Sequence, residues 1–210
     1  MREYTTKLLR GADLSDDLMI SEAFEKVSRA DFLPEGIRSK ANLDQALPIG
    51  YGQTNSQPST VVFMLSLLAP KVGEKVLDVG FGSGWTTALL ARIVGSSGKV
   101  VGLEVNKQVF DFGKQNLKKY RFKNIKLYHA TAWKDFPGTD VFDKILVSAA
   151  SKTIPRKLLD RLKVGGRLLI PLVDKRSVGL SHELTIVDKK AKNQYLKKSY
   201  PGFVFVPLIK

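Results

Sequence analysis

The chain has 210 residues, 43% of them apolar, which suits a single α/β domain with a sizeable core. It carries 34 lysines and arginines against 20 aspartates and glutamates, with two histidines and no cysteine, which excludes disulfides and thiolate metal sites and argues against any metal site. No apolar run approaches the roughly 18 residues that cross a bilayer, and the N-terminus lacks a secretory signal, so a cytoplasmic protein is expected.

The first third of the chain predicts two helices separated by a long irregular segment. Ala23, Phe24 and Val27 would share one face of a helix over residues 21–29. Residues 39–58 show no clear periodicity and are rich in glycine, glutamine and asparagine. A loop of that length inside a compact domain is usually functional or disordered, and Leu47-Pro-Ile49 with the polar run after it favours a functional loop. A second helix is expected over residues 59–68.

Strands and helices alternate from residue 75 onward, which predicts βαβ units around a mostly parallel sheet. The expected strands are 75–79, 99–103, 125–128, 142–147 and 167–171, and the expected helices are 85–94, 107–120 and 155–162. Two further strands, 180–187 and 202–206, flank a charged loop and predict an antiparallel edge. Residues 1–58 would form an N-terminal helical segment with a substrate and cofactor loop, and residues 59–210 a Rossmann-like core, together one compact domain.

A glycine-rich turn connects the first of these strands to the helix that follows it, in the sequence Val76-Leu-Asp-Val-Gly80-Phe-Gly82-Ser-Gly84-Trp85. Glycines there allow a sharp turn and a close approach of the backbone to a ligand. About twenty residues later, Glu104 ends the next strand, where a carboxylate can accept hydrogen bonds from both hydroxyls of a ribose. The two features predict a nucleoside site; a turn that binds nothing is the alternative.

The spacing of the glycines favours S-adenosylmethionine over a dinucleotide. A dinucleotide fingerprint requires a third glycine where Trp85 stands. Asp78, just before the turn, would repel a phosphate but suits a cationic amino-acid tail. The Asp-x-Gly-x-Gly-x-Gly pattern resembles motif I of S-adenosylmethionine methyltransferases, which implies a Rossmann-like methyltransferase fold. A nicotinamide or flavin site is the alternative.

Several segments, in order from about residue 20 to the end, resemble protein-L-isoaspartate O-methyltransferases. Besides motif I they are residues 30–34, 47–58, 142–150, 162–171 and 205–208. The most specific is Gly52-Gln-Thr-Asn-Ser-Gln-Pro58, because this family carries its catalytic serine in a Gly-Gln-Thr-Ile-Ser-Gln-Pro segment. The resemblance implies that Ser56 is the catalytic residue, which holds the acceptor carboxylate in line with the methyl group.

The same resemblance implies a cofactor, a substrate and a set of binding residues. The cofactor would be S-adenosyl-L-methionine, and the substrate L-isoaspartyl residues in damaged proteins or peptides. Their methyl ester collapses to a succinimide that reopens partly as normal aspartate. The residues expected to bind the cofactor are Gln53, Thr54, Asn55, Asp78, Gly80, Phe81, Gly82, Ser83, Gly84, Glu104 and Thr131. No metal is expected.

The chain departs from the family pattern at three places. Asn55 replaces the family's isoleucine, Trp85 its tyrosine, and Ala130-Thr131-Ala132 its Gly-Asp-Gly. A backbone amide near Thr131 could still serve the adenine end of the cofactor.

Two other functions compete. An RNA or DNA methyltransferase would fit the net charge of +14, although the chain has no Asn-Pro-Pro-Tyr-like tetrapeptide, catalytic cysteine or RNA-binding appendage. A cofactor-binding protein without catalysis is the third hypothesis. The basic charge also predicts a non-specific attraction to nucleic acid. A monomer without membrane contact is expected.

Overall fold

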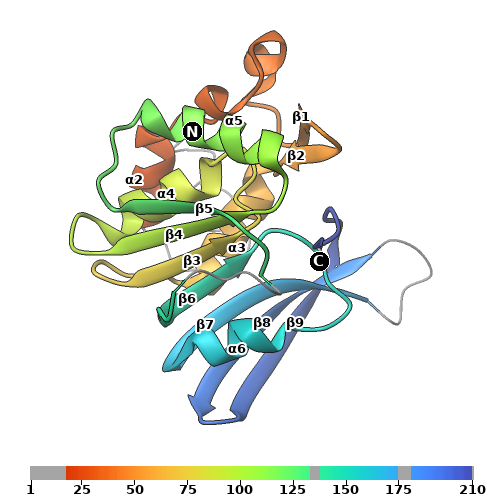
Figure 1. The fold of residues 1–210 in the computed structure, drawn as a ribbon. Coiled ribbons are helices and arrows are strands. Elements are labelled where there is room, and N and C mark those ends of the chain that lie inside the picture. The colour runs from red at the N-terminus through yellow and green to blue at the C-terminus, as the bar shows by residue number, and fades with distance from the viewer. Residues whose placement is uncertain (1–17, 133–137, 175–180, 210) are drawn as a thin grey trace.

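The computed structural model describes residues 18–132, 138–174 and 181–209. Within them, seven strands form one twisted sheet (Figure 1). In their order across the sheet, the strands are β5 (Ile125–His129), β4 (Lys99–Glu104), β3 (Lys75–Val79), β6 (Phe142–Val147), β7 (Leu162–Val173), β8 (His182–Ala191) and β9 (Gln194–Phe203). The first five are parallel to one another, and β8 and β9 add an antiparallel edge. The predicted fold class is therefore confirmed.

Five α-helices and two short 3-10 helices accompany the sheet in the described residues. The α-helices are α2 (Leu18–Lys26), α3 (Pro58–Leu68), α4 (Trp85–Val94), α5 (Lys107–Lys118) and α6 (Arg156–Arg161), and the 3-10 helices are η1 (Arg29–Phe32) and η2 (Glu35–Lys40). No described helix is long and apolar enough to cross a membrane.

Successive side chains of the central strands point to opposite faces of the sheet, and both faces are buried. In β3, Val76 belongs to a core shared with α2, α3 and α4, whereas Leu77 belongs to a second core that contains Leu158 of α6. Both side chains are fully buried, as expected for parallel strands covered by helices on both sides. Ile20 and Phe24 of α2 lie in the first of these cores, so the N-terminal segment packs directly on the sheet domain.

The segment over residues 39–58 is more ordered than its sequence predicts. It contains a small antiparallel hairpin of β1 (Leu47–Gly50) and β2 (Gln53–Asn55). Gly50, Tyr51 and Gly52 all have positive φ angles at the turn, which two glycines make accessible. This hairpin stands apart from the large sheet, above the carboxyl ends of its strands (Figure 1).

The C-terminal hairpin also differs from prediction. The charged stretch expected to be a loop is strand: β8 continues to Ala191 and β9 begins at Gln194, rather than at residue 202. Lysines are uncommon in strands generally but common in edge strands, where one side faces water. The first helix lies three residues earlier than predicted, and residue 180, where the first tail strand was expected to begin, lies outside the described residues.

Candidate active site

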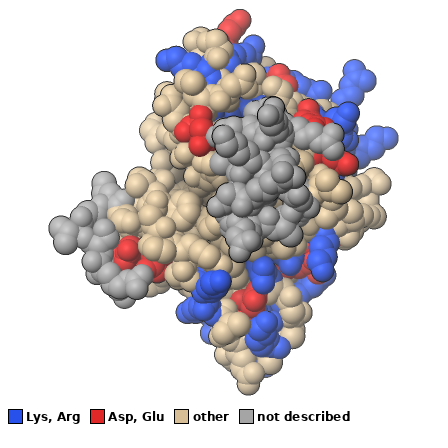
Figure 2. All heavy atoms as spheres, turned by 180° about the vertical axis from the view of Figure 1, so that it is seen from behind, with Lys and Arg blue, Asp and Glu red and all other residues tan. Residues whose placement is uncertain are grey.

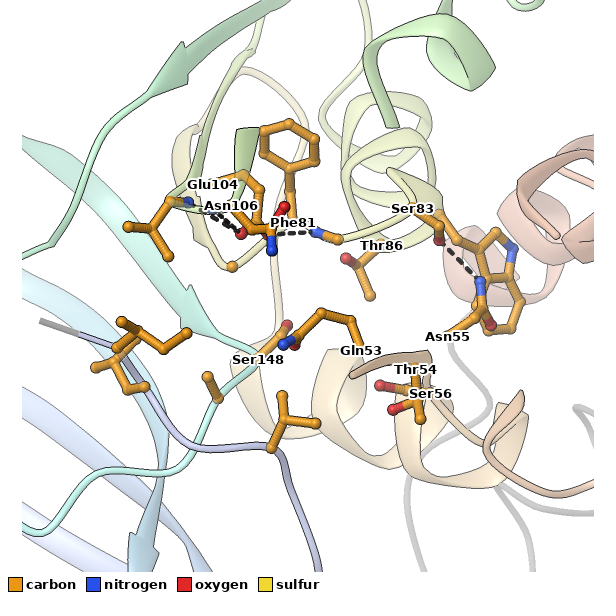
Figure 3. Close-up of a pocket in the computed structure, with 18 of the residues that line it drawn as sticks. Gln53, Thr54, Asn55, Ser56, Phe81, Ser83, Thr86, Glu104, Asn106 and Ser148 are labelled. Atoms are coloured by element: carbon orange, nitrogen blue, oxygen red, sulfur yellow. Dashed lines mark hydrogen bonds between the residues drawn. The ribbon is translucent and has the colours of Figure 1, made fainter. Parts of the chain in front are cut away.

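A cleft lies at the carboxyl ends of β3, β4 and β6 (Figure 3). In an open α/β sheet, ligands bind where consecutive connections leave a strand in opposite directions, and β3 is such a strand, flanked by β4 and β6. The lining residues of the cleft are Gln53, Thr54, Asn55, Ser56, Gly80, Phe81, Gly82, Ser83, Trp85, Thr86, Glu104, Val105, Asn106, Ser148, Ala149, Val206, Pro207, Leu208 and Ile209.

The glycine turn forms one wall of the cleft. Gly82 and Gly84 have φ angles of 56° and 90°, in the left-handed region that favours glycine. At Gly84 a Cβ atom would also lie 2.9 Å from the Leu117 side chain and 3.1 Å from the carbonyl oxygen of Gly113, both in α5. The turn therefore needs glycine both for its conformation and for its close packing on α5.

Glu104, at the end of β4, is held in a fixed orientation by backbone donors. One carboxylate oxygen accepts from the N–H groups of Val105 (2.9 Å) and Asn106 (3.0 Å), and the other from Gly82 N–H (3.1 Å). A carboxylate offers about four acceptor positions, so these three bonds leave room for a ligand hydroxyl. Glu104 thus connects the end of β4 to the glycine turn and presents an acceptor to the cleft.

Asp78 lies at the base of the glycine turn and is fully buried. One of its oxygens accepts from the hydroxyls of Thr87 (2.6 Å) and Thr86 (3.0 Å), and the other has no hydrogen-bond partner among the described residues. Burial raises the Asp78 pKa from 3.8 to about 6, against the opposing effect of the two threonine hydroxyls, and the charge of Glu104 adds to the rise. Asp78 does not line the cleft, although Thr86 does.

The opposite wall comes from β2 and the residues after it. Alternate residues of an extended segment face the same side, and Figure 3 shows the hydroxyls of Thr54 and Ser56 next to each other on one side of this segment. The Ser56 carbonyl accepts a 2.9 Å hydrogen bond from Nη2 of the buried Arg29. Asp44 accepts from Gln57 Nε2 and from Ser59 N–H, which fixes the start of α3.

Residues near position 206 close the cleft from the side of β6. Ala150 N–H donates to the Val206 carbonyl (2.8 Å), and Leu208 N–H donates to the Ala150 carbonyl (2.7 Å). Ser148, which directly follows β6, has a buried hydroxyl without a hydrogen-bond partner among the described residues. Sequence reasoning assigned no role to these positions, although both lie in segments that carry the family resemblance, which was the signal that could have found them.

The structure brings together all but three of the residues predicted to form the site. Asp78 is buried behind the cleft wall, Gly84 is the residue before α4, and Thr131 follows β5 without lining the cleft. The roles predicted for them stay predictions. His129 ends β5, and Nε2 of its ring lies 2.9 Å from the Val105 carbonyl.

No lysine or arginine is among the described residues that line the cleft. On the face drawn in Figure 2, lysines and arginines occupy the top, the right edge and the bottom, with acidic residues among them. Within the described parts of the chain, no group of three or more potential metal-ligating side chains was found.

Comparisons with known proteins agree with this architecture. The sequence profile of the family "Protein-L-isoaspartate(D-aspartate) O-methyltransferase (PCMT)" matches residues 6–210. The protein-L-isoaspartate O-methyltransferase of Methanopyrus kandleri is 37% identical, over 99% of this chain and 91% of the relative. Protein-L-isoaspartate O-methyltransferase 2 of Archaeoglobus fulgidus is 38% identical, over 99% and 92%. A crystal structure from Plasmodium falciparum, described as a protein-L-isoaspartate O-methyltransferase in complex with S-adenosyl-L-homocysteine, matches with a TM-score of 0.83 and 25% identity, over 99% and 98% of the two chains.

Proposed function

Because this chain belongs to the protein-L-isoaspartate(D-aspartate) O-methyltransferase family, we propose that it transfers a methyl group from S-adenosyl-L-methionine to the carboxylate of L-isoaspartyl residues in damaged proteins and peptides. The observation that carries this proposal is the cleft, in which the segment of Ser56 faces the glycine turn and Glu104. A nucleoside-binding wall opposite a wall of hydroxyls suits transfer from such a cofactor to a carboxylate.

The residues of the cleft fit this cofactor. Glu104 has a free acceptor position for ribose hydroxyls, and the glycine turn allows close approach of the backbone. The hydroxyl of Ser148 is buried without a partner among the described residues, so it is available to the amino-acid part. When bound, the cofactor supplies a methyl group on a positively charged sulfur.

Ser56 would act on the acceptor rather than as a base. A carboxylate with an ordinary pKa of about 4 is ionised at pH 7, so it can accept a methyl group without losing a proton. What remains for the protein is alignment and exclusion of water. The half-buried Ser56 lines the cleft, and its hydroxyl can donate a hydrogen bond that orients the carboxylate.

The substrate is tested with labelled S-adenosylmethionine and three acceptors: an isoaspartyl peptide, the same peptide with normal aspartate, and bulk RNA. We expect label in the isoaspartyl peptide alone, released as methanol by mild base. Equal labelling of both peptides would overturn the substrate assignment, and base-stable label in RNA would favour a nucleic-acid methyltransferase.

Ser56→Ala tests the proposed catalytic residue, with Thr54→Val as its neighbouring control. Loss of a hydrogen bond made in the transition state should lower kcat by about 100-fold, while the affinity for S-adenosylhomocysteine stays within a factor of two. If Thr54→Val abolishes turnover and Ser56→Ala does not, the donor is Thr54 and the assignment is wrong.

We also propose that the protein acts as a monomer in the cytoplasm, with only non-specific attraction to nucleic acid. The absence of cysteine from the sequence fits a reducing compartment, and a cleft whose described lining residues include no lysine or arginine fits an attraction to nucleic acid that is only non-specific. Sedimentation at micromolar concentration tests the monomer.

A further inference from the structure

The side chain of Asn55 connects two parts of the cleft that are far apart in sequence. It is 3% exposed, its Oδ1 accepts from Nε of Arg29 (2.8 Å), and its Nδ2 donates to the hydroxyl of Ser83 (2.9 Å; Figure 3). Both ends of the amide therefore have protein partners. One partner follows α2, and the other lies in the glycine turn.

Arg29, on one side of this connection, holds the segment that contains Ser56. It is 2% exposed and stands 5.4 Å from the centre of the Trp85 ring. Its guanidinium donates to the Ser56 carbonyl (2.9 Å) and also to the carbonyls of residues 41, 43, 45 and 55. One buried guanidinium group thus binds five backbone carbonyls between residue 41 and residue 56.

Ser83, on the other side, is fixed in the glycine turn. It is 4% exposed, and its carbonyl accepts a 3.1 Å hydrogen bond from Nδ2 of Asn116 in α5. The hydrogen bonds from Arg29 through Asn55 and Ser83 to Asn116 form one buried series, called here the Asn55 bridge. It joins the wall that carries Ser56 to the wall made by the glycine turn.

We infer that Asn55 is a positioning residue that sets the place of Ser56 relative to the glycine turn, and this inference rests on the proposed function. An isoleucine, as in the family segment, would fill the space but leave Arg29 Nε and the Ser83 hydroxyl without this partner. Transfer between two bound groups depends steeply on alignment, and a misplacement of about 1 Å can cost about 100-fold in rate. The bridge therefore acts on turnover more than on binding.

The test compares Asn55→Leu, which keeps the size of the side chain but forms no hydrogen bond, with Ser83→Ala and the double variant. Asn124→Leu is the matched control, because Asn124 is a partly buried asparagine that donates to the Ala91 and Gly95 carbonyls at the end of α4. We measure kcat, KM for an isoaspartyl peptide, affinity for S-adenosylhomocysteine and melting temperature. Amide hydrogen exchange of residues 53–57 is measured without ligand.

Asn55→Leu should lower kcat by 10- to 100-fold and change cofactor affinity less than threefold. The double variant should be no slower than the slower single variant, since both remove the same connection. Exchange at residues 53–57 should quicken in Asn55→Leu and Ser83→Ala but not in Asn124→Leu, which lowers the melting temperature alone.

Unchanged kcat in Asn55→Leu, additive losses in the double variant, or parental exchange at residues 53–57 would overturn the inference. An inactive parent protein would overturn the proposed function, whereas the exchange experiment would still report whether the Asn55 bridge holds the two walls together.

Discussion

Asp78→Asn should change how the stability of this protein depends on pH. Burial raises the Asp78 pKa from 3.8 to about 6, so the folded state binds the proton more tightly than the unfolded state does. The stabilisation is fully present below pH 3.8 and is lost as the pH rises through about 6. At about 1.4 kcal/mol for each step of one in pKa, the loss amounts to about 3 kcal/mol.

The asparagine variant cannot ionise at this position, so it lacks this dependence. Its amide oxygen can still accept from Thr86 and Thr87, but its NH2 group would face the place where Asp78 has no partner among the described residues. That buried donor costs about 1–3 kcal/mol at every pH. The informative quantity is therefore the parent-minus-variant difference in unfolding free energy rather than its value at one pH.

Urea denaturation of both proteins at intervals between pH 4 and pH 8 measures this difference. We expect it to fall by about 2.4 kcal/mol across that range, because part of the stabilisation is already lost at pH 4, and most of the change should come between pH 4 and pH 6.5. A difference that stays constant within about 0.5 kcal/mol would refute the elevated pKa. The affinity for the sulfonium cofactor should instead increase as the pH rises. Ionised Asp78 is an anion beneath the glycine turn, and an anion there attracts the positively charged sulfur.

Two further predictions concern the cofactor wall and the surface. Glu104→Gln should weaken S-adenosylhomocysteine binding by about 2 kcal/mol, or roughly 30-fold, because an amide replaces one charged acceptor; calorimetry that finds parental affinity would remove Glu104 from the cofactor site. Binding to a random-sequence RNA should be weak and should fall steeply as salt rises from 50 to 200 mM, and sequence-selective binding that survives the higher salt would contradict a merely non-specific attraction.

The parallel core could be predicted from the sequence because its signals are local. Strand β3 (Lys75–Val79) has the predicted bounds, since a short apolar run before a glycine turn specifies a buried strand without distant information. The β1–β2 hairpin was not predicted, because Pro48 and three residues with positive φ interrupt the alternation of apolar and polar residues that marks a strand. Its far end is also held by Arg29, which is distant in sequence. Strand β9 escaped because its lysines are favourable only at an edge.

In the site too, residues that belong to short sequence motifs could be predicted, whereas residues brought there by tertiary contacts could not. The motif residues around Gly82 and Ser56 were predictable, since short sequence segments carry them. Ser148 and the segment near Val206 reach the cleft only through the pairing of strands and of the backbone at Ala150. The burial of Asp78 likewise depends on packing around the turn, which no spacing of residues reveals.

The two outer strands of the sheet give the basic charge of this protein a role in solubility. β5 and β9 each leave one row of backbone donors and acceptors unpaired within the described sheet, and an unpaired row is a template for adding another strand. Exposed lysines lie on both strands, Lys126 on β5 and Lys197 and Lys198 on β9, and β9 also contains Pro201. Substrates that are themselves polypeptides could supply such an added strand. The lysines on both edges and the proline on β9 disfavour the addition of such a chain to the sheet.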